Sequence, residues 1–188
     1  ATSFSLAGSA LRGGSDSRIT LSNVTVHASW VYQGGDALLG VAPPLGSNTT
    51  VFVSVSVGLN AQQFTGGLDF GYFIDPRVDE VSPSTGSVLG GTLVTLSGSD
   101  FSGGSVYRCR FGDTLTDASV SGDNYDHLLC QLPPQLPVTP RAVEVSLNGQ
   151  EFSSSGLLFF VYDTPLLSSL SPSGGPSEGG TLVQMQVQ

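Results

Sequence analysis

The chain repeats one stretch of its own sequence, and this repetition constrains its fold more than any other feature. Val78–Phe101 is expected to run from a short apolar strand through a Ser-Pro-Ser-Thr-Gly turn and a Gly-Gly hinge to the alternating strand Leu-Val-Thr-Leu. The residues from Ser171 to Val183 restate its first half, and Thr2–Ser15 restates its second half, Thr92–Ser105. Self-similarity of this kind is typical of a chain built from several copies of one folding unit.

The local patterns favour β-strands. No segment shows the 3.6-residue apolar period of a long helix, and 25 glycines and 11 prolines divide the chain into short segments. Val51–Val57 has a valine at every second position, Leu68–Phe73 has the composition of a closing strand, and a bulge or tight turn is expected near Asn23. In the central part we expect strands at 77–81, 92–98, 105–111, 115–120, 126–131, 141–147 and 156–162. Short strands at this regular spacing predict an all-β, immunoglobulin-like sandwich.

Matching positions along the chain predict where the units begin and end. Pro76 corresponds to Pro165, and the Pro-Pro pair at 43–44 corresponds to the pair at 133–134. We therefore expect residues 1–75 to be a repeat without its first strand, 76–163 to be a complete repeat, and 164–188 to be the truncated start of a third. Because the sequence starts and stops inside repeats, we expect it to be a segment of a longer polypeptide. The same matching aligns Val53, Val55 and Val57 with Val143, Val145 and Leu147.

The net charge and the hydropathy pattern of the chain argue against nucleic-acid binding and against membrane insertion. Fifteen acidic residues against six arginines, with no lysine, give a formal net charge of −9. A surface of this sign repels phosphate backbones, so nucleic-acid binding is disfavoured. The sequence also contains no apolar run of about eighteen residues, so we expect no membrane insertion by this segment.

The central unit carries a set of positions that resembles a known family. The positions are Val78–Val81 with Ser82-Pro83, Gly86, Gly90-Gly91-Thr92, Val94-Thr95-Leu96, Gly98, Phe101, Cys109–Gly112, Cys130 with Pro133-Pro134, Val143–Val145, Asn148-Gly149, Phe159 and Tyr162. They resemble the IPT/TIG domains of plexins, fibrocystin-like surface proteins and some transcription factors. The resemblance implies tandem immunoglobulin-like β-sandwiches of the E-set type. It also favours an extracellular or cell-surface location, because the extracellular members carry paired cysteines and the transcription factors need basic loops.

Cys109 and Cys130 are the only cysteines of the chain, and both face inward on their expected strands. The first unit has Ile19 and Gly40 at the matching positions, so both cysteines are replaced together. We expect a disulfide between Cys109 and Cys130, which matches the resemblance. The alternative is a pair of buried free thiols in a reducing compartment.

Other residues suggest modification more than catalysis. Asn23 and Asn48 each begin an Asn-x-Thr sequence, so both are candidate N-glycosylation sites. His127 follows Asp126, but neighbouring strand residues should point to opposite faces, and no nucleophile is placed beside them. The acidic segments 113–117 and 122–126 lack the dense ligand pattern of a calcium loop. We expect no catalytic residue, no metal site and no cofactor.

These observations leave a main hypothesis and two alternatives. The first is a non-catalytic structural or interaction segment of a multi-repeat surface glycoprotein, a rod or filament-forming array whose partners are neighbouring repeats, further copies or other surface proteins. The second is a receptor or adhesin ectodomain that binds a protein or glycan through its loops, with Tyr32, Tyr107 and Tyr125 as candidate contacts. The third is an accessory β-domain of a carbohydrate-active enzyme.

Overall fold

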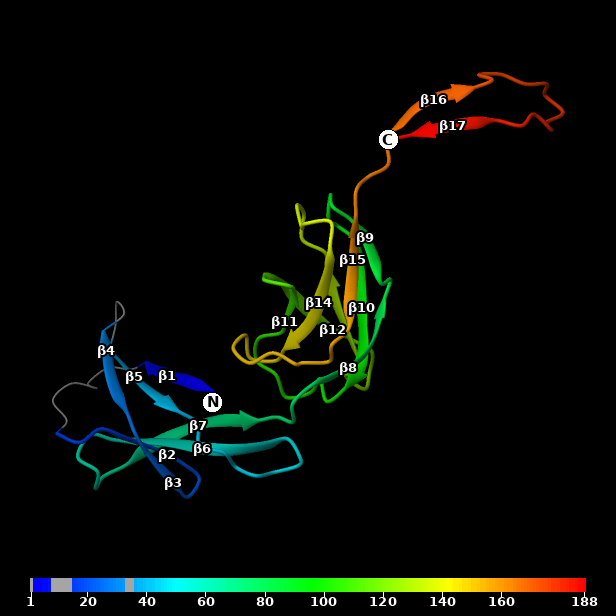
Figure 1. The fold of residues 1–188 in the computed structure, drawn as a ribbon. Coiled ribbons are helices and arrows are strands. Elements are labelled where there is room, and N and C mark those ends of the chain that lie inside the picture. Colours follow the sequence, from blue (N-terminus) through cyan, green and yellow to red (C-terminus); the bar gives the residue numbers. More distant parts are fainter. Residues whose placement is uncertain (1, 8–14, 33–35) are drawn as a thin grey trace.

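A computed structural model of the chain describes residues 2–7, 15–32 and 36–188. Its regular elements are all β-strands, as the alternating sequence patterns predict (Figure 1). The first unit contains β1 (Ser3–Ala7), β2 (Arg18–Leu21), β3 (Val24–His27), β4 (Ser29–Tyr32), β5 (Asp36–Val41), β6 (Val51–Gly58) and β7 (Thr65–Tyr72). The second contains β8 (Arg77–Ser82), β9 (Thr85–Ser87), β10 (Leu93–Ser99), β11 (Arg108–Phe111), β12 (Thr114–Ser121), β13 (His127–Gln131), β14 (Pro140–Ser146) and β15 (Leu158–Tyr162). A hairpin of β16 (Leu167–Ser171) and β17 (Gln184–Val187) follows.

The second unit is a β-sandwich in which β12, and the segment from β8 to β9, each pair with strands of both layers. The strand order is β8-β10-β13-β12-β11-β14-β15-β9. The first half of β12 pairs with β11 and its second half pairs with β13. On the opposite side, β8 pairs antiparallel with β10, and β9 pairs parallel with β15. The core between the layers includes the edge-to-face pair Phe111 and Phe159, whose ring centroids are 5.4 Å apart.

The first unit has the same pairing, split into two sheets. One sheet has the order β1-β5-β4 and the other β3-β2-β6-β7. The β2·β3 hairpin pairs Leu21 with Val24, just as β11·β12 pairs Phe111 with Thr114. β3 and β4 together therefore take the place of β12. The tight turn expected near Asn23 is present, since Ser22 has a φ of 53° between β2 and β3. Ile19, Leu21, Leu38, Val53 and Val55 are the buried residues of the core that this unit forms.

The structure corrects one part of the internal alignment. Leu21 pairs with Val55 in the first unit, whereas its counterpart Phe111 pairs with Val143 in the second. Val55 therefore corresponds to Val143, so the expected alignment of β6 with β14 was wrong by two residues. The run from Val51 to Val57 has valines at a two-residue period, so a two-residue shift matches almost as well and keeps the same face inward.

Two further differences lie at strand ends. Ser-Pro-Ser-Thr-Gly was expected to be a turn only, but Thr85–Ser87 forms the short strand β9. The strand expected at 105–111 begins instead at Arg108, and Val106 makes only an isolated bridge with Asn148. The remaining strands of the second unit lie within two residues of their expected positions.

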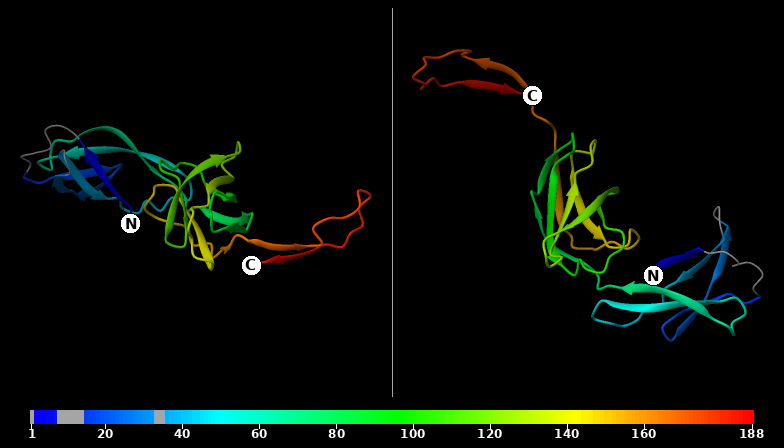
Figure 2. Two further views of the ribbon diagram at one scale, coloured as in Figure 1. Left: turned by 90° about the horizontal axis from the view of Figure 1, so that it is seen from above. Right: turned by 180° about the vertical axis from the view of Figure 1, so that it is seen from behind.

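The β16·β17 hairpin repeats the opening pair of the second unit. Leu170 pairs with Met185 and Ser171 with Gln184, as Val81 pairs with Leu96 and Ser82 with Thr95. The hairpin projects beyond the second unit, away from both sandwiches (Figures 1 and 2). Both strands are exposed along their whole length.

Candidate functional site: the joint between the first two units

The first two units meet end to end around the linker 73–76, which connects β7 to β8 (Figure 1). One contact between them is made by the turn between β14 and β15. The side chain of Gln150 on this turn pairs with the backbone of Ser3 at the start of β1. The Ser3 N–H donates to Gln150 Oε1 at 3.1 Å, and Gln150 Nε2 donates to the Ser3 carbonyl at 2.8 Å. The carboxamide thus bonds to the outer edge of β1 in the way that a neighbouring strand would.

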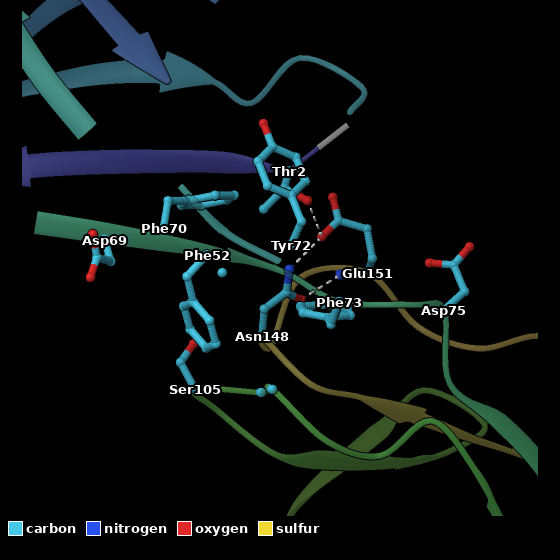
Figure 3. Close-up of a pocket in the computed structure, with 13 residues that line it drawn as sticks. Thr2, Phe52, Asp69, Phe70, Tyr72, Phe73, Asp75, Ser105, Asn148 and Glu151 are labelled. Atoms are coloured by element: carbon cyan, nitrogen blue, oxygen red, sulfur yellow. Dashed lines mark hydrogen bonds between the residues drawn. The ribbon is translucent and has the colours of Figure 1, made fainter. Parts of the chain in front are cut away.

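Asn148 holds this turn in shape. Its Oδ1 accepts hydrogen bonds from the backbone N–H groups of Gln150, at 3.0 Å, and Glu151, at 3.1 Å. Asparagine favours such turns because its side chain can replace a backbone acceptor. Glu151 Oε2 in turn accepts from Asn148 Nδ2 at 2.8 Å and from Thr2 Oγ1 at 3.1 Å (Figure 3). The result is a fixed turn with two side chains that reach the first unit.

Glycines allow the backbones of the two units to approach closely. A Cβ on Gly103 would lie 2.7 Å from Thr50 Cγ2, and one on Gly71 would lie 3.7 Å from the Gly103 carbonyl oxygen. Gly103 also has a φ of +80°, a conformation that side chains rarely adopt. A larger residue at Gly103 would therefore push the units apart.

A cavity of about 400 Å³ lies at this joint. Figure 3 shows aromatic side chains of the first unit beside polar residues of the second. Tyr72 on this wall donates a hydrogen bond from Oη to the Pro43 carbonyl at 2.8 Å, and burial raises the pKa of its phenol. The lining residues include Thr2, Phe52, Phe70, Tyr72, Phe73, Gly103, Ser105, Asn148 and Glu151.

The structure brings the two cysteines together. Cys109 on β11 and Cys130 on β13 are bonded through their sulfur atoms, with Cα atoms 6.3 Å apart. Both are fully buried between the layers. In the first unit, a Cβ on Gly40 would lie 3.1 Å from Ile19 Cδ1. The isoleucine side chain therefore occupies the position that the disulfide takes in the second unit.

Both candidate glycosylation residues lie on the surface of the first unit. Asn23 is exposed in the turn between β2 and β3. Asn48 is exposed in the loop between β5 and β6. Neither contributes to the core, so an attached sugar would meet solvent.

The remaining candidate residues form no catalytic arrangement in the described residues. His127 Nε2 lies 3.7 Å from Asp126 Oδ1, so the expectation that they point apart was wrong; Asp126 precedes β13 and is free to turn back. His127 Nδ1 lies 3.1 Å from Ser97 Oγ. Tyr107 Oη accepts a hydrogen bond from the Gly104 N–H, Tyr125 is exposed, and the side chain of Tyr32 lies outside the described part.

Within the same described ranges, no group of three or more His, Cys, Asp or Glu side chains is arranged to hold a metal ion. Nor does that part of the chain contain a helix long and apolar enough to cross a membrane.

Gln150 is the joint residue that sequence reasoning missed. A signal for it exists, because Leu-Asn-x-Gln occurs at 59–62 and again at 147–150. Asn60 forms the same turn as Asn148, with its Oδ1 accepting from the N–H groups of Gln62 and Gln63 at 3.1 and 3.0 Å. Both units therefore carry the same turn.

Comparison with known proteins places the second unit in a family. Residues 76–162 match the sequence model of the IPT/TIG domain. Human fibrocystin-L is 32% identical over 109 residues, which are 56% of this chain and 2% of fibrocystin-L. Human plexin-A3 is 29% identical over 114 residues, which are 59% of this chain and 6% of plexin-A3. The solved extracellular region of plexin A4 has the same fold, with a TM-score of 0.57 and 16% identity over 94% of this chain and 17% of that one.

Proposed function

Residues 76–162 form an IPT/TIG domain, and from this premise we propose that the chain is a non-catalytic segment of an extracellular array of such domains. In this array, residues 1–75, 76–163 and 164–188 are consecutive repeats that act as a semi-rigid rod. The joint carries the proposal. Gln150 and Glu151 of the second unit both bind the start of β1 in the first, so the two units contact each other beyond the linker.

The repeated turn supports an array of more than one such joint. Asn60 and Gln62 form the turn of the first unit between β6 and β7, at the end that faces away from the second unit (Figure 1). Leu93 at the start of β10 is the counterpart of Ser3 and lies at the other end of the second unit. Each unit thus has a turn of the Gln150 type at one end and, at the other end, the start of a strand to which such a turn can bind. The same kind of contact can therefore form between every two neighbouring units.

The extracellular location has two supports of its own. The disulfide between Cys109 and Cys130 persists in oxidising compartments and is rare in reducing ones. The solved structure of plexin A4, which has the same fold, is that of its extracellular region. The exposed Asn23 and Asn48 are then open to N-glycosylation, so we propose a glycoprotein.

Small-angle X-ray scattering on the 188-residue chain tests the rod. Gln150→Ala removes the side chain that binds Ser3 and should broaden the distribution of distances between the first two units. Gln62→Ala is the matched control, because it alters the same turn where no neighbouring unit is present in the structure. Equal scattering from wild type and Gln150→Ala would contradict a joint held by this contact.

A receptor or adhesin segment is the second candidate, and one observation favours it. Leu158, Phe160 and Tyr162 alternate along β15 with their side chains exposed, and a row of apolar side chains suits a protein partner. The full-length transcript separates the candidates. A cytoplasmic signalling domain would favour the receptor, and a long series of repeats without one would favour the rod. A catalytic domain on the same transcript would instead favour the accessory β-domain of a carbohydrate-active enzyme.

A further inference from the structure

The turn between β14 and β15 surrounds the side-chain amide of Asn148 with hydrogen-bonding groups. Asn148 Oδ1 accepts from the backbone N–H groups of Gln150 and Glu151, and from the hydroxyl of Ser146 at 3.2 Å. Asn148 Nδ2 donates to Glu151 Oε2 at 2.8 Å. The oxygen and the nitrogen of the amide are thus both held in place. The carbon between them, Cγ, is the atom that a nucleophile would attack.

The next residue, Gly149, supplies a nucleophile for this carbon. Its backbone nitrogen can close a ring onto Asn148 Cγ, and the nitrogen is joined to Asn148 through a single carbonyl carbon, so no diffusion is needed. Its N–H donates to Ser146 Oγ at 2.8 Å. The Ser146 hydroxyl therefore accepts from the nucleophile and donates to the oxygen of the amide under attack. Gly149 is exposed and has no Cβ to obstruct ring closure.

The matching turn of the first unit has the same shape without these groups. Asn60 Oδ1 accepts from the backbone N–H groups of Gln62 and Gln63, as Asn148 Oδ1 does in its own turn. The next residue, Ala61, has a φ of 57°, close to the 73° of Gly149. Three other positions differ together: Ser146, Gly149 and Glu151 correspond to Gly58, Ala61 and Gln63. The turn therefore forms without a hydroxyl, a glycine or a carboxylate.

We propose that Asn148 is a self-modification site, at which the Gly149 nitrogen attacks Cγ and closes a succinimide ring. The new bond joins the Gly149 nitrogen to Cγ, and the bond between Cγ and Nδ2 breaks. The proton lost by the Gly149 nitrogen leaves with Nδ2 as ammonia. Water then opens the ring at either of its two carbonyl carbons. The product at this position is aspartate or isoaspartate.

The groups around the amide each have a role in this reaction. The backbone N–H groups of Gln150 and Glu151 stabilise the negative charge that develops on Asn148 Oδ1. Ser146 Oγ accepts the proton of the attacking nitrogen. The Glu151 carboxylate holds Nδ2 and is placed to carry a proton to the departing nitrogen.

The product loosens the joint between the first two units, a consequence that rests on the proposed rod. A carboxylate at position 148 has no proton to donate to Glu151, so two negative charges face each other where a hydrogen bond stood. Isoaspartate also adds a methylene group to the backbone shortly before Gln150, the residue that binds Ser3. The joint of a newly made chain is then stiffer than that of an aged one.

Peptide mapping of the folded chain during incubation at neutral pH tests the reaction. Cleavage after arginine releases 142–188, in which Asn148 is the only asparagine, and 19–77, which contains Asn60. We expect 142–188 to lose the mass of ammonia and then to gain that of water, while Asn60 stays unchanged. The same chain unfolded in guanidinium chloride should react more slowly at Asn148. Faster reaction in the unfolded chain, or none in the folded one, would overturn the proposal.

Three variants separate catalysis by the turn from the simple reactivity of an Asn-Gly pair. Gly149→Ala should stop the reaction, and the first unit shows that the turn accepts alanine. Ser146→Ala and Glu151→Gln keep the Asn-Gly pair and should each slow the reaction by ~100-fold, the lower end of general acid–base catalysis. Circular dichroism checks that both remain folded, and Glu151→Gln changes a turn residue that contributes nothing to the core. Reaction as fast as in the wild type, or faster, in Glu151→Gln would mean that the turn protects Asn148, and would also overturn the proposal.

Small-angle X-ray scattering on Asn148→Asp tests the effect on the joint separately. This variant carries one of the two products in every molecule. We expect its distribution of distances to broaden as that of Gln150→Ala does. Wild-type scattering from Asn148→Asp, together with a broadened distribution for Gln150→Ala, would refute the effect of the modification on the joint and leave the rod in place. Wild-type scattering from both would refute the rod, whereas the reaction itself is judged by mass alone.

Discussion

Gly40 shows how the two units fill the same internal position in different ways. A Cβ on this glycine would lie 2.9 Å from Phe4 Cζ and 3.1 Å from Ile19 Cδ1. The first unit therefore joins its layers by packing two apolar side chains over a glycine. The second joins them covalently through Cys109 and Cys130. The cysteine pair was predicted from the inward-facing parity of both residues, from their joint replacement by Ile19 and Gly40 in the first unit, and from the family resemblance.

Replacement of both cysteines should destabilise the second unit. The disulfide spans a sequence separation of 21 residues. The double variant Cys109→Ala/Cys130→Ala removes the crosslink that closes this loop. On the chain-entropy estimate, its free energy of unfolding should fall by about 3 kcal/mol. Urea denaturation followed by circular dichroism measures the change. The double variant Cys109→Ser/Cys130→Ser separates the crosslink from apolar packing, and wild-type stability in both variants would contradict a structural role for the bond.

Asp16 makes an acid-sensitive contact in the first unit. Arg18 Nη2 donates to Asp16 Oδ2 at 2.8 Å, and this hydrogen bond holds the pKa of the carboxyl below its ordinary value. A carboxyl with a lowered pKa stabilises the fold above its ordinary pKa, and that contribution is lost as the pH falls through the folded value. NMR titration should show the Asp16 pKa rising in Arg18→Gln. Arg108→Gln, in the other unit, should leave it unchanged; an unaltered Asp16 pKa in Arg18→Gln would exclude the pairing.

Whole strands were easier to predict than their pairing. β6, β10 and β14 follow from alternation because one face of each is buried. β9 was missed because three residues that pair in parallel with β15 have no periodic signature of their own. The two-residue error between β6 and β14 arose because Val51–Val57 resembles itself after such a shift. Both failures concern long-range pairing, which local residue types do not encode.

The β16·β17 hairpin should be the least protected pair of strands. It packs against no second layer in the described residues, and all its side chains are exposed. Local opening there costs little, because it uncovers no buried apolar surface. Hydrogen exchange read by mass spectrometry should show fast exchange in 167–187 and slow exchange in β10 and β13. Equal protection of both pairs in the dilute monomer would require a partner surface for the hairpin.

At the scale of the whole molecule, the joint was the part that sequence reasoning could not place. The linker was predicted from the correspondence of Pro76 with Pro165, but the reach of Gln150 to Ser3 depends on how the two units are oriented. The repeated Leu-Asn-x-Gln sequence singles out Gln150, but it does not show which residue Gln150 contacts. The disulfide lies within one unit, so the inward-facing parity of its two strands and the resemblance to a known family led to its prediction.

The proposed glycoprotein makes a prediction about mass. In material from a secretory host, intact-mass analysis should show the mass of N-linked glycans. Asn23→Gln and Asn48→Gln should each remove the mass of one glycan. The turn at Asn23 and the loop at Asn48 are exposed, so neither variant should change the unfolding midpoint. Protein mass without sugar in the wild type would contradict glycosylation at both residues.

The parallel pairing of β9 with β15 has a mechanical consequence. Tension on a rod would pull the start of β8 and the end of β15 in opposite directions. Because β9 follows β8 and pairs in parallel with β15, β9 and β15 would slide past each other under load. Their bonds, which include the Phe160 N–H to Ser84 carbonyl contact at 2.9 Å and the Val88 N–H to Tyr162 carbonyl contact at 2.9 Å, are then sheared together and not opened one by one. The short strand that was expected to be only a turn would thus be the part of the second unit that carries force.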